Sequence, residues 1–154
     1  LLAGPEPLKF QACLPLMRDF QDADAWAYVI EQAGSSDASR LRTALNWIGD
    51  TKPTGQPPPA ALVAHLDRLL AADASQRRAA VLALGKFGGH QSVSRLIKSL
   101  SDSDAIVGRE ADACLCGQPD RALVKRLLNE AIPASTSSTL QSRLRTLLAR
   151  IERS

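Results

Sequence analysis

Cys114 and Cys116 are separated by one residue and form the pattern that most resembles half of a metal site. A structural zinc ion takes four ligands, which proteins supply mostly as cysteine thiolates and histidine imidazoles. The chain has one further cysteine, Cys13, but no second cysteine pair and no histidine nearby in sequence. We therefore expect no metal and no cofactor. Both thiols are expected to be structural, because free cysteines are commonly buried.

Histidine is the side chain best suited to proton transfer near neutral pH, and the chain has two, His65 and His90. Neither lies in a recognisable motif with a nucleophile and an acid. His90 follows two glycines and is expected in a solvated turn. The glycine-rich segment 85–90 lacks the Gly-x-x-x-x-Gly-Lys-Ser/Thr order of a phosphate-binding loop, and no strand precedes it. The sequence therefore predicts a protein that is not an enzyme.

The composition favours an all-α fold. Hydrophobic residues make up 45% of the 154 residues and aromatic residues only 4%, and a core of Leu and Ala suits closely packed helices. No run approaches the roughly 20 apolar residues that span a bilayer, so we expect no membrane partner. The odd number of cysteines favours reduced thiols and a cytoplasmic location. The first residues, Leu1–Pro5, lack a Met and are expected to be the edge of a trimmed chain.

An internal repeat is the most informative pattern, and its period is about 31 residues. We call the step from Arg78 to Arg109 the repeat step. Further pairs recur at the same step: Ala80 and Ala111, Leu84 and Leu115, Val93 and Val124, Leu96 and Leu127. A longer step relates Arg42–Gly49 to Arg78–Gly85, because a Pro-rich insertion lies at 50–59. Cys114 and Cys116 then stand where Ala83 and Gly85 stand, at small packed positions. Trp47, just before the insertion, either fills space or marks a binding edge.

Each unit is interpreted as two amphipathic helices. The first begins at an Asp or Ser cap and ends at a glycine such as Gly49 or Gly85, and the second carries apolar residues at i, i+3, i+4 and i+7. The expected helices are 6–20 (irregular near Pro15), 24–33, 38–49, 58–71, 75–87, 91–101, 105–116, 120–131 and 138–152. Because one hairpin cannot cover its own apolar stripe, the hairpins must stack into a solenoid.

The expected organisation is a single domain of about four hairpins. It consists of an N-terminal cap or first unit (1–37), a unit with the insertion (38–72), two regular units (73–104 and 105–132) and a capping helix (138–152). The pattern Arg-x-Ala-x-x-x-Leu-Gly, a Val-x-x-Leu-Ile helix and then Asp-x-Asp resembles the HEAT-like repeats first named in phycobilisome lyases. The resemblance implies an α-solenoid. Its function stays open, because such repeats occur in scaffolds, adaptors, lyases and some DNA-repair enzymes. The paired His-Glu ligands of the HEAT-like hydroxylase are absent.

The resemblance also implies that the second helices line the concave surface of the solenoid. The repeat step, or a step one position shorter, would then place His65, Arg95 and Arg126 in one column, and Arg68 and Lys98 in another. These residues would form a basic stripe that meets an acidic protein segment, a phosphorylated segment or a nucleic-acid backbone. Alternatively, they only solvate the polar faces of amphipathic helices.

A second implication of the resemblance concerns the first helices. Arginines at the repeated position, which are Arg42, Arg78 and Arg109, are expected to pair with a turn aspartate of a neighbouring unit. The candidate aspartates are Asp73, Asp102 and Asp104. This Arg/Asp ladder would be structural and would not belong to the binding stripe.

The charge is uneven, because residues 1–74 contain six Lys/Arg and nine Asp/Glu, whereas residues 75–154 contain thirteen and seven. We expect a non-catalytic scaffold or adaptor whose basic stripe binds a protein partner with an acidic surface. A nucleic-acid-binding module is an alternative, although the second helices have almost no aromatic residues. An accessory subunit of a lyase-type enzyme is another.

Overall fold

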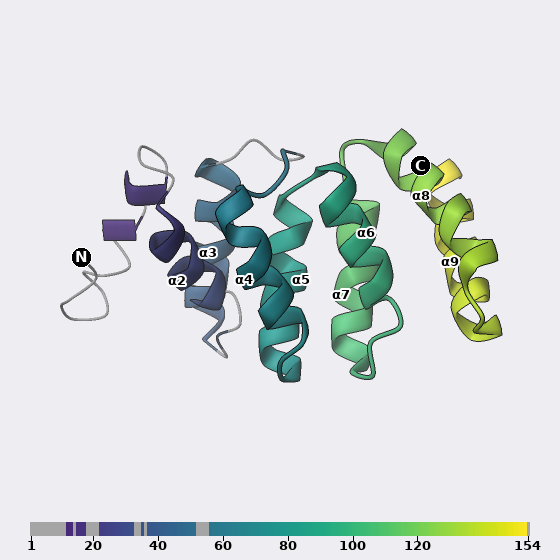
Figure 1. Cartoon of the computed structure of the whole chain (residues 1–154), viewed down its shortest axis with the longest axis horizontal. Helices are drawn as coiled ribbons and strands as arrows, with labels where there is room; N and C mark the ends of the chain where they lie inside the picture. Colours follow the sequence, from purple (N-terminus) through teal and green to yellow (C-terminus); the bar gives the residue numbers. More distant parts are fainter. Residues whose placement is uncertain are drawn as a thin grey trace.

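The chain folds into α-helices that stand side by side in a row (Figure 1). The computed structural model describes residues 12–13, 15–17, 22–32, 35, 37–51 and 56–153. The helices with defined bounds are α2 (Ala23–Gln32), α3 (Ala38–Thr51), α4 (Ala60–Leu70), α5 (Ala74–Lys86), α6 (Gly89–Ser99), α7 (Ala105–Cys116), α8 (Arg121–Ala134) and α9 (Ser138–Arg153). No strand occurs in these described ranges.

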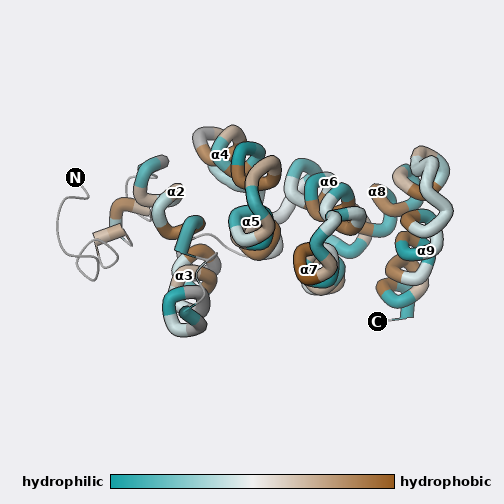
Figure 2. Tube along the Cα trace, turned by 90° about the horizontal axis from the view of Figure 1, so that it is seen from below, coloured by the Kyte–Doolittle hydropathy of each residue, from teal (hydrophilic) through white to brown (hydrophobic). Residues whose placement is uncertain are grey.

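Alternate helices form two layers. The first helices of the units make one layer, in which α3 packs on α5, α5 on α7 and α7 on α9. The second helices make the other, in which α2 contacts α4 and α6 contacts α8. Figure 2 shows α4, α6 and α8 along one side of the row and α3, α5 and α7 along the other. This two-layered stack of helical hairpins is the predicted all-α solenoid.

Aspartate side chains begin most of the helices, as the sequence predicted. Asp73 accepts a hydrogen bond from the backbone N–H of Gln76, and Asp120 accepts one from that of Leu123. Asp104 accepts from two N–H groups at the start of α7. These carboxylates satisfy donors that have no partner within the helix, and they favour the positive end of its dipole. These aspartates therefore fix the residues at which α5, α7 and α8 begin.

The predicted glycine stops are wrong. Helix α3 continues past Gly49 to Thr51, and α5 continues past Gly85 to Lys86. Gly85 has a packing role instead, because a Cβ atom added there would lie 3.0 Å from the Cβ of Cys114 and closer still to its Sγ. A glycine is needed at this point because α7 approaches the backbone of α5.

The remaining bounds lie within a few residues of the predicted ones. Helix α8 runs to Ala134 rather than 131, because the N–H of Ser135 donates to the carbonyl of Ala131 (3.0 Å) and closes the last turn around Pro133. Most of the helix predicted at 6–20 lies outside the described residues, although residues 12–13 and 15–17 are helical. The division into units remains a prediction.

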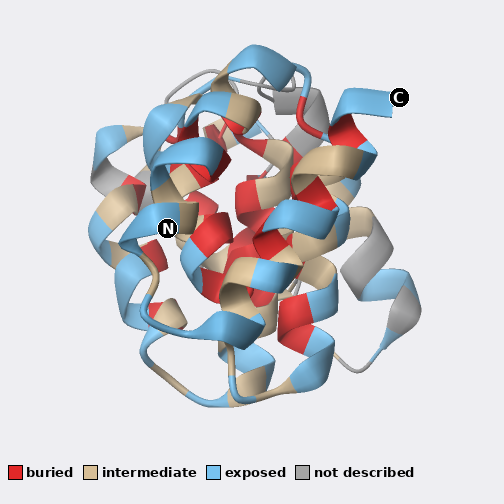
Figure 3. Cartoon of the chain, turned by 90° about the vertical axis from the view of Figure 1, so that its right-hand side faces the viewer, coloured by how far each residue is buried: buried red, intermediate tan, exposed pale blue. Residues whose placement is uncertain are grey.

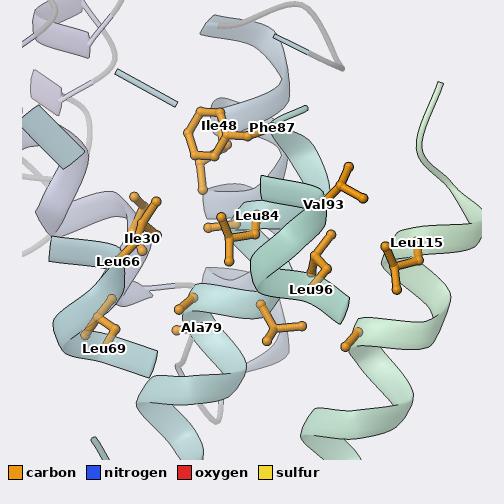
Figure 4. Close-up of a cluster of buried hydrophobic side chains, with 14 of the residues drawn as sticks. Ile30, Ile48, Leu66, Leu69, Ala79, Leu84, Phe87, Val93, Leu96 and Leu115 are labelled. Carbon is orange, nitrogen blue, oxygen red and sulfur yellow. The ribbon is translucent and has the colours of Figure 1, made fainter. Parts of the chain in front are cut away.

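Seen along the row, the buried residues lie at the centre of the molecule, between the helices (Figure 3). The core cluster includes residues from Cys13 to Ile151. Figure 4 shows Leu66 and Leu69 of α4, Leu84 of α5 and Leu96 of α6 in this cluster. Buried positions in the second helices recur at the repeat step, in three sets: Leu62, Val93 and Val124; Leu66, Ile97 and Leu128; Leu96 and Leu127. The sequence repeat is therefore also a repeat of burial.

Two large aromatic rings close the core near its N-terminal end. Trp26 of α2 and Phe87, which follows α5, are both fully buried, and their ring centroids are 5.6 Å apart. The backbone N–H of Gly88 donates to the carbonyl of Gln56 (2.6 Å), so the described end of the Pro-rich insertion contacts the turn between α5 and α6. Trp47 is partly buried against the core.

Candidate partner-binding surface

The five residues predicted to form the basic stripe lie on the second helices. His65 and Arg68 belong to α4, Arg95 and Lys98 to α6, and Arg126 to α8. The structure separates them into two groups. Arg68, Lys98 and Arg126 are exposed, whereas His65 and Arg95 are engaged by neighbouring helices. We call the surface that carries Arg68, Lys98 and Arg126 the second-helix face.

Arg95 joins two consecutive units through an ion pair that the sequence analysis did not predict. Its Nε and Nη2 atoms donate to the two carboxylate oxygens of Asp67 on α4, at 2.7 and 2.8 Å. The hydrogen bonds from Arg95 lower the pKa of the Asp67 carboxyl group below its ordinary value. This bidentate geometry is the strongest form of an arginine–carboxylate contact. Arg95 therefore links α6 to α4 in this structure.

His65 packs inward rather than along the stripe. Its side chain is only 12% exposed, and its Nε2 atom lies 3.9 Å from Oε1 of Glu31 on α2. Burial lowers the pKa of His65 below its ordinary value, with Glu31 opposing this effect and Arg68 adding to it. His65 is therefore neutral at neutral pH and contributes no charge to the second-helix face.

The spacing of the buried residues explains why the predicted columns of basic residues differ from those in the structure. The second helices align at the full repeat step, which places His65 level with the buried Leu96 and Asp67 level with Lys98. The shorter step had aligned Arg68 with Lys98. One residue turns a helical position by about 100°, so this single-position difference moves His65 from the exposed face to the interior.

An open pocket of about 430 Å³ lies between α4 and α6 on this side of the molecule. Its lining includes the Asp67–Arg95 pair, Lys98 and Asp102. Arg68 borders the same side and donates to Nδ1 of His65 (3.2 Å). Within the described ranges, no ion pair engages Lys98 or Arg126. Lys98 on α6 and Arg126 on α8 are therefore cations of this surface that no described carboxylate neutralises.

The predicted pairing of Arg78 with a turn aspartate does not form, and its neighbour Arg77 forms such a pair instead. Arg77, not Arg78, donates to both carboxylate oxygens of Asp102 (2.8 and 2.9 Å) and also to the carbonyl of Ala72 (2.7 Å). Arg78 instead pairs with Glu110 on α7 (3.0 Å). The reason is again the rotation between successive residues of a helix, because the side chain at position 77, not that at 78, projects towards the turn that holds Asp102.

The other members of that predicted ladder have separate roles. Asp73 and Asp104 cap α5 and α7. Arg109 is exposed, and no carboxylate in the described part of the chain pairs with it. The side chain of Arg42 lies outside the described residues.

The cysteines occupy small packed positions. Cys114 is packed against Gly85, and its thiol lies 3.7 Å from the carbonyl oxygen of Val81, to which it can donate. Burial raises the pKa of Cys114 to about 12 and also raises the pKa of Cys13 and of Cys116. In the part of the chain that the structure describes, His, Cys, Asp and Glu form no group that could hold a metal ion.

Two polar residues that join the helices were missed by the sequence analysis. Gln118 is buried, and its Nε2 donates to the carbonyls of Gly85 (3.2 Å) and Phe87 (3.0 Å) at the end of α5. Arg143 of α9 donates to the carbonyls of Leu100 (2.6 Å) and Gly108 (2.8 Å). The repeat contains a sequence signal for both residues. At the repeat step, the polar Gln118 stands where Phe87 stands, and Gly108, whose carbonyl Arg143 contacts, stands where Arg77 stands.

Comparison with known families supports the repeat interpretation. Residues 76–102 match the family model described as PBS lyase HEAT-like repeat. This stretch covers most of α5, all of α6 and the turn that reaches Asp102. A search of curated proteins and a search of solved structures find no match. None of the described helices combines the length and the apolar character needed to cross a lipid bilayer.

Proposed function

We propose that this chain, of which residues 76–102 match a HEAT-like repeat model, is a non-catalytic module that binds a protein partner on its second-helix face. The observation that carries the proposal is the set of exposed cations on three consecutive second helices: Arg68, Lys98 and Arg126. Stacked repeats of this kind present extended surfaces on which successive units contribute side chains. The partner surface is expected to be acidic, because charge complementarity guides association and orientation.

Binding is favoured over catalysis by the state of the candidate reactive groups. The three thiols have raised pKa values, which disfavour the nucleophilic thiolate. His65 is packed between α4 and α2, and no nucleophile lies among its described hydrogen-bond partners. The helices α4, α6 and α8 also carry no Phe, Tyr or Trp on which a nucleic-acid base could stack. A protein partner is therefore favoured over single-stranded nucleic acid.

The test compares partner capture by two variants with equal charge changes. In the face variant, Arg68, Lys98 and Arg126 are changed to Glu; in the control, Arg109, Arg145 and Arg153 are changed to Glu. All six side chains are exposed. The immobilised wild-type chain and the control should capture the same proteins from an extract, and the face variant should lose them. Equal capture by the two variants would refute the second-helix face as the binding surface.

Duplex and single-stranded DNA provide the comparison with a nucleic-acid function. Contacts to phosphates give binding that weakens steeply as salt increases. We expect weak binding to both DNAs even at low salt. Tight binding that falls steeply with salt, and that the face variant loses, would replace the protein partner with nucleic acid.

A further inference from the structure

The Asp67–Arg95 pair has a counterpart of like charge in the next unit. One repeat step moves Asp67 to Lys98 and Arg95 to Arg126. The buried residues of the same helices follow this step, from Leu66 to Ile97 on one side and from Leu96 to Leu127 on the other. The repeat position that carries the Asp67 carboxylate on α4 therefore carries the Lys98 ammonium group on α6, where Lys98 also lines the pocket between α4 and α6.

Helices α6 and α8 pack directly against one another, which keeps these two positions on adjoining surfaces. Lys98 and Arg126 are both exposed, and neither forms an ion pair within the described residues. Lys125, which precedes Arg126, adds a half-buried cation, and Glu130 is the exposed acid of α8 one turn further on. Asp67 lies near enough to Lys98 to feel its charge, but its two oxygens are already bound by Arg95. The surface between α6 and α8 thus lacks the carboxylate that its repeat equivalent has.

We propose that Lys98 and Arg126 together bind a carboxylate side chain from an acidic segment of the protein partner, in the place that Asp67 fills in the preceding unit. This inference rests on the proposed function and names the anchoring group of that same face. The partner's Asp or Glu would accept hydrogen bonds from the Arg126 guanidinium, as Asp67 accepts them from Arg95. Lys98 would supply a second positive charge beside that guanidinium.

A carboxylate is favoured because the chain itself uses one in the equivalent position. Arginine binds carboxylates with a planar pair of donors, whereas lysine acts as a point charge that tolerates several geometries. An Arg and a Lys on neighbouring helices therefore suit one carboxylate that is contacted from two sides. An extended acidic segment can deliver further carboxylates to Arg68 along the same face.

The first experiment measures thermal stability without any partner. Changing Lys98 to Asp places a carboxylate at the position equivalent to Asp67, where Arg126, the equivalent of Arg95, can pair with it. Lys98→Asp should therefore raise Tm relative to Arg109→Asp, which makes the same charge change on an exposed residue of α7. This increase in Tm should disappear in the Lys98→Asp/Arg126→Asp double variant. A Tm of Lys98→Asp at or below that of Arg109→Asp overturns the proposed placement.

The second experiment measures binding of fluorescein-labelled poly-glutamate by fluorescence polarisation. Lys98→Asp should weaken binding about five- to tenfold, as expected for the loss of one charge contact, while Arg109→Asp should change it little. Equal affinity of the two variants, or no binding by the wild-type chain, overturns the acidic anchor. Tighter binding of a phosphoserine peptide or of duplex DNA than of poly-glutamate overturns the carboxylate as ligand.

Capture of the natural partner by the face variant and by Lys98→Asp separates an error in the proposed function from an error in the Lys98–Arg126 anchor. If the three-residue face variant loses the natural partner but Lys98→Asp binds it normally, the proposed function stands and the Lys98–Arg126 anchor is wrong. If neither variant affects capture, the second-helix face is wrong and the anchor is wrong with it.

Discussion

At the scale of single residues, the contact between Gly85 and Cys114 determines how closely α5 and α7 approach. A Cβ atom at position 85 would meet the Cβ of Cys114 at 3.0 Å and would overlap its sulfur. The sulfur can rotate about χ1, but the Cβ of Cys114 is fixed to the α7 backbone, so that contact is relieved only by a shift of α7 relative to α5. Gly85 is therefore a packing residue, although it lies inside a helix where glycine is unfavourable.

Gly85→Ala is expected to destabilise the protein by about 1–3 kcal/mol, because the added methyl group overpacks the interface. Helix propensity acts in the opposite direction, since alanine is favoured over glycine by about 1 kcal/mol in a helix interior. The sign of the change in unfolding free energy, measured by urea denaturation, therefore separates the two effects.

Cys114→Ala provides the control for this substitution. Removing the sulfur relieves the closest overlap, so Gly85→Ala should cost less in the Cys114→Ala background than in the wild type. A stabilising effect of Gly85→Ala in the wild-type chain would show that α5 and α7 are further apart than described.

The raised pKa of Cys114 predicts low reactivity and a specific pH dependence. At pH 8 a thiol with a pKa of about 12 is ionised in about one molecule in ten thousand, so iodoacetamide should leave Cys114 unmodified in the folded chain. All three cysteines should react in urea. Peptide mass spectrometry gives the result, and equal alkylation of Cys114 in the folded and unfolded chains contradicts it.

The same group makes the fold sensitive to alkaline pH. In the unfolded chain the Cys114 thiol ionises near its ordinary pKa of 9.0, whereas in the folded chain it retains its proton to about 12. The folded state therefore binds more protons in this interval, and stability falls as pH rises from about 9 towards 12. The Cys114→Ala variant should lack this component of the fall.

At the scale of helices, α9 is attached to the rest of the molecule by polar contacts as well as by its apolar stripe. Leu144, Leu147 and Ile151 are buried, while Arg143 reaches the carbonyls of Leu100 and Gly108. Arg150 of α9 also pairs with Asp112 of α7. The guanidinium group of Arg143 lies against Gly108, which is the repeat equivalent of Arg77. A Cβ atom added at position 108 would lie 3.1 Å from Nη1 of Arg143.

Arg143→Met is expected to lower the unfolding free energy by about 1–3 kcal/mol, because two partly covered carbonyls lose their donor. Arg145→Met is the matched control, since Arg145 is exposed on the same helix. Chemical denaturation of the two variants gives the comparison. Equal stability of both variants would show that water replaces the Arg143 donors at no cost.

The helices were predictable because their signals are local. Apolar spacing and an aspartate cap predicted a helix at 105–116, and α7 has those bounds. The predicted end of the helix at Gly85 was wrong, because the glycine at this position allows α7 to approach α5 and does not end α5. The ion pairs failed for the same reason: Arg77 and Arg78 differ in direction by about 100°, and only the packed helices show which of them faces Asp102. The sequence repeat predicted the two layers of helices, but it did not predict how each helix is rotated about its own axis.

At the scale of the whole molecule, each helix contacts mainly its neighbours in the row. Stability in such a chain is close to a sum of unit and interface contributions, and local opening need not involve the whole structure. The position of a core substitution should therefore determine how far its effect spreads.

Leu84→Ala and Leu147→Ala remove equally buried side chains from the centre and the end of the row. Each should cost about 2–5 kcal/mol locally. In hydrogen–deuterium exchange, Leu147→Ala should increase exchange mainly in α8 and α9, whereas Leu84→Ala should increase it from α2 to α7. A uniform increase for both variants would indicate a single cooperative unit.

The close contact at Gly85 also bears on how this molecule could be lengthened. A tandem copy of residues 74–104, inserted before α7, would place a second α5 against the first. Gly85 would then face Ala83 of the new copy, because Ala83 and Cys114 are equivalent at the repeat step. Alanine is smaller than cysteine, so the new junction would fit without a clash. The row could thus grow from within while α9 stayed packed against α7 and α8.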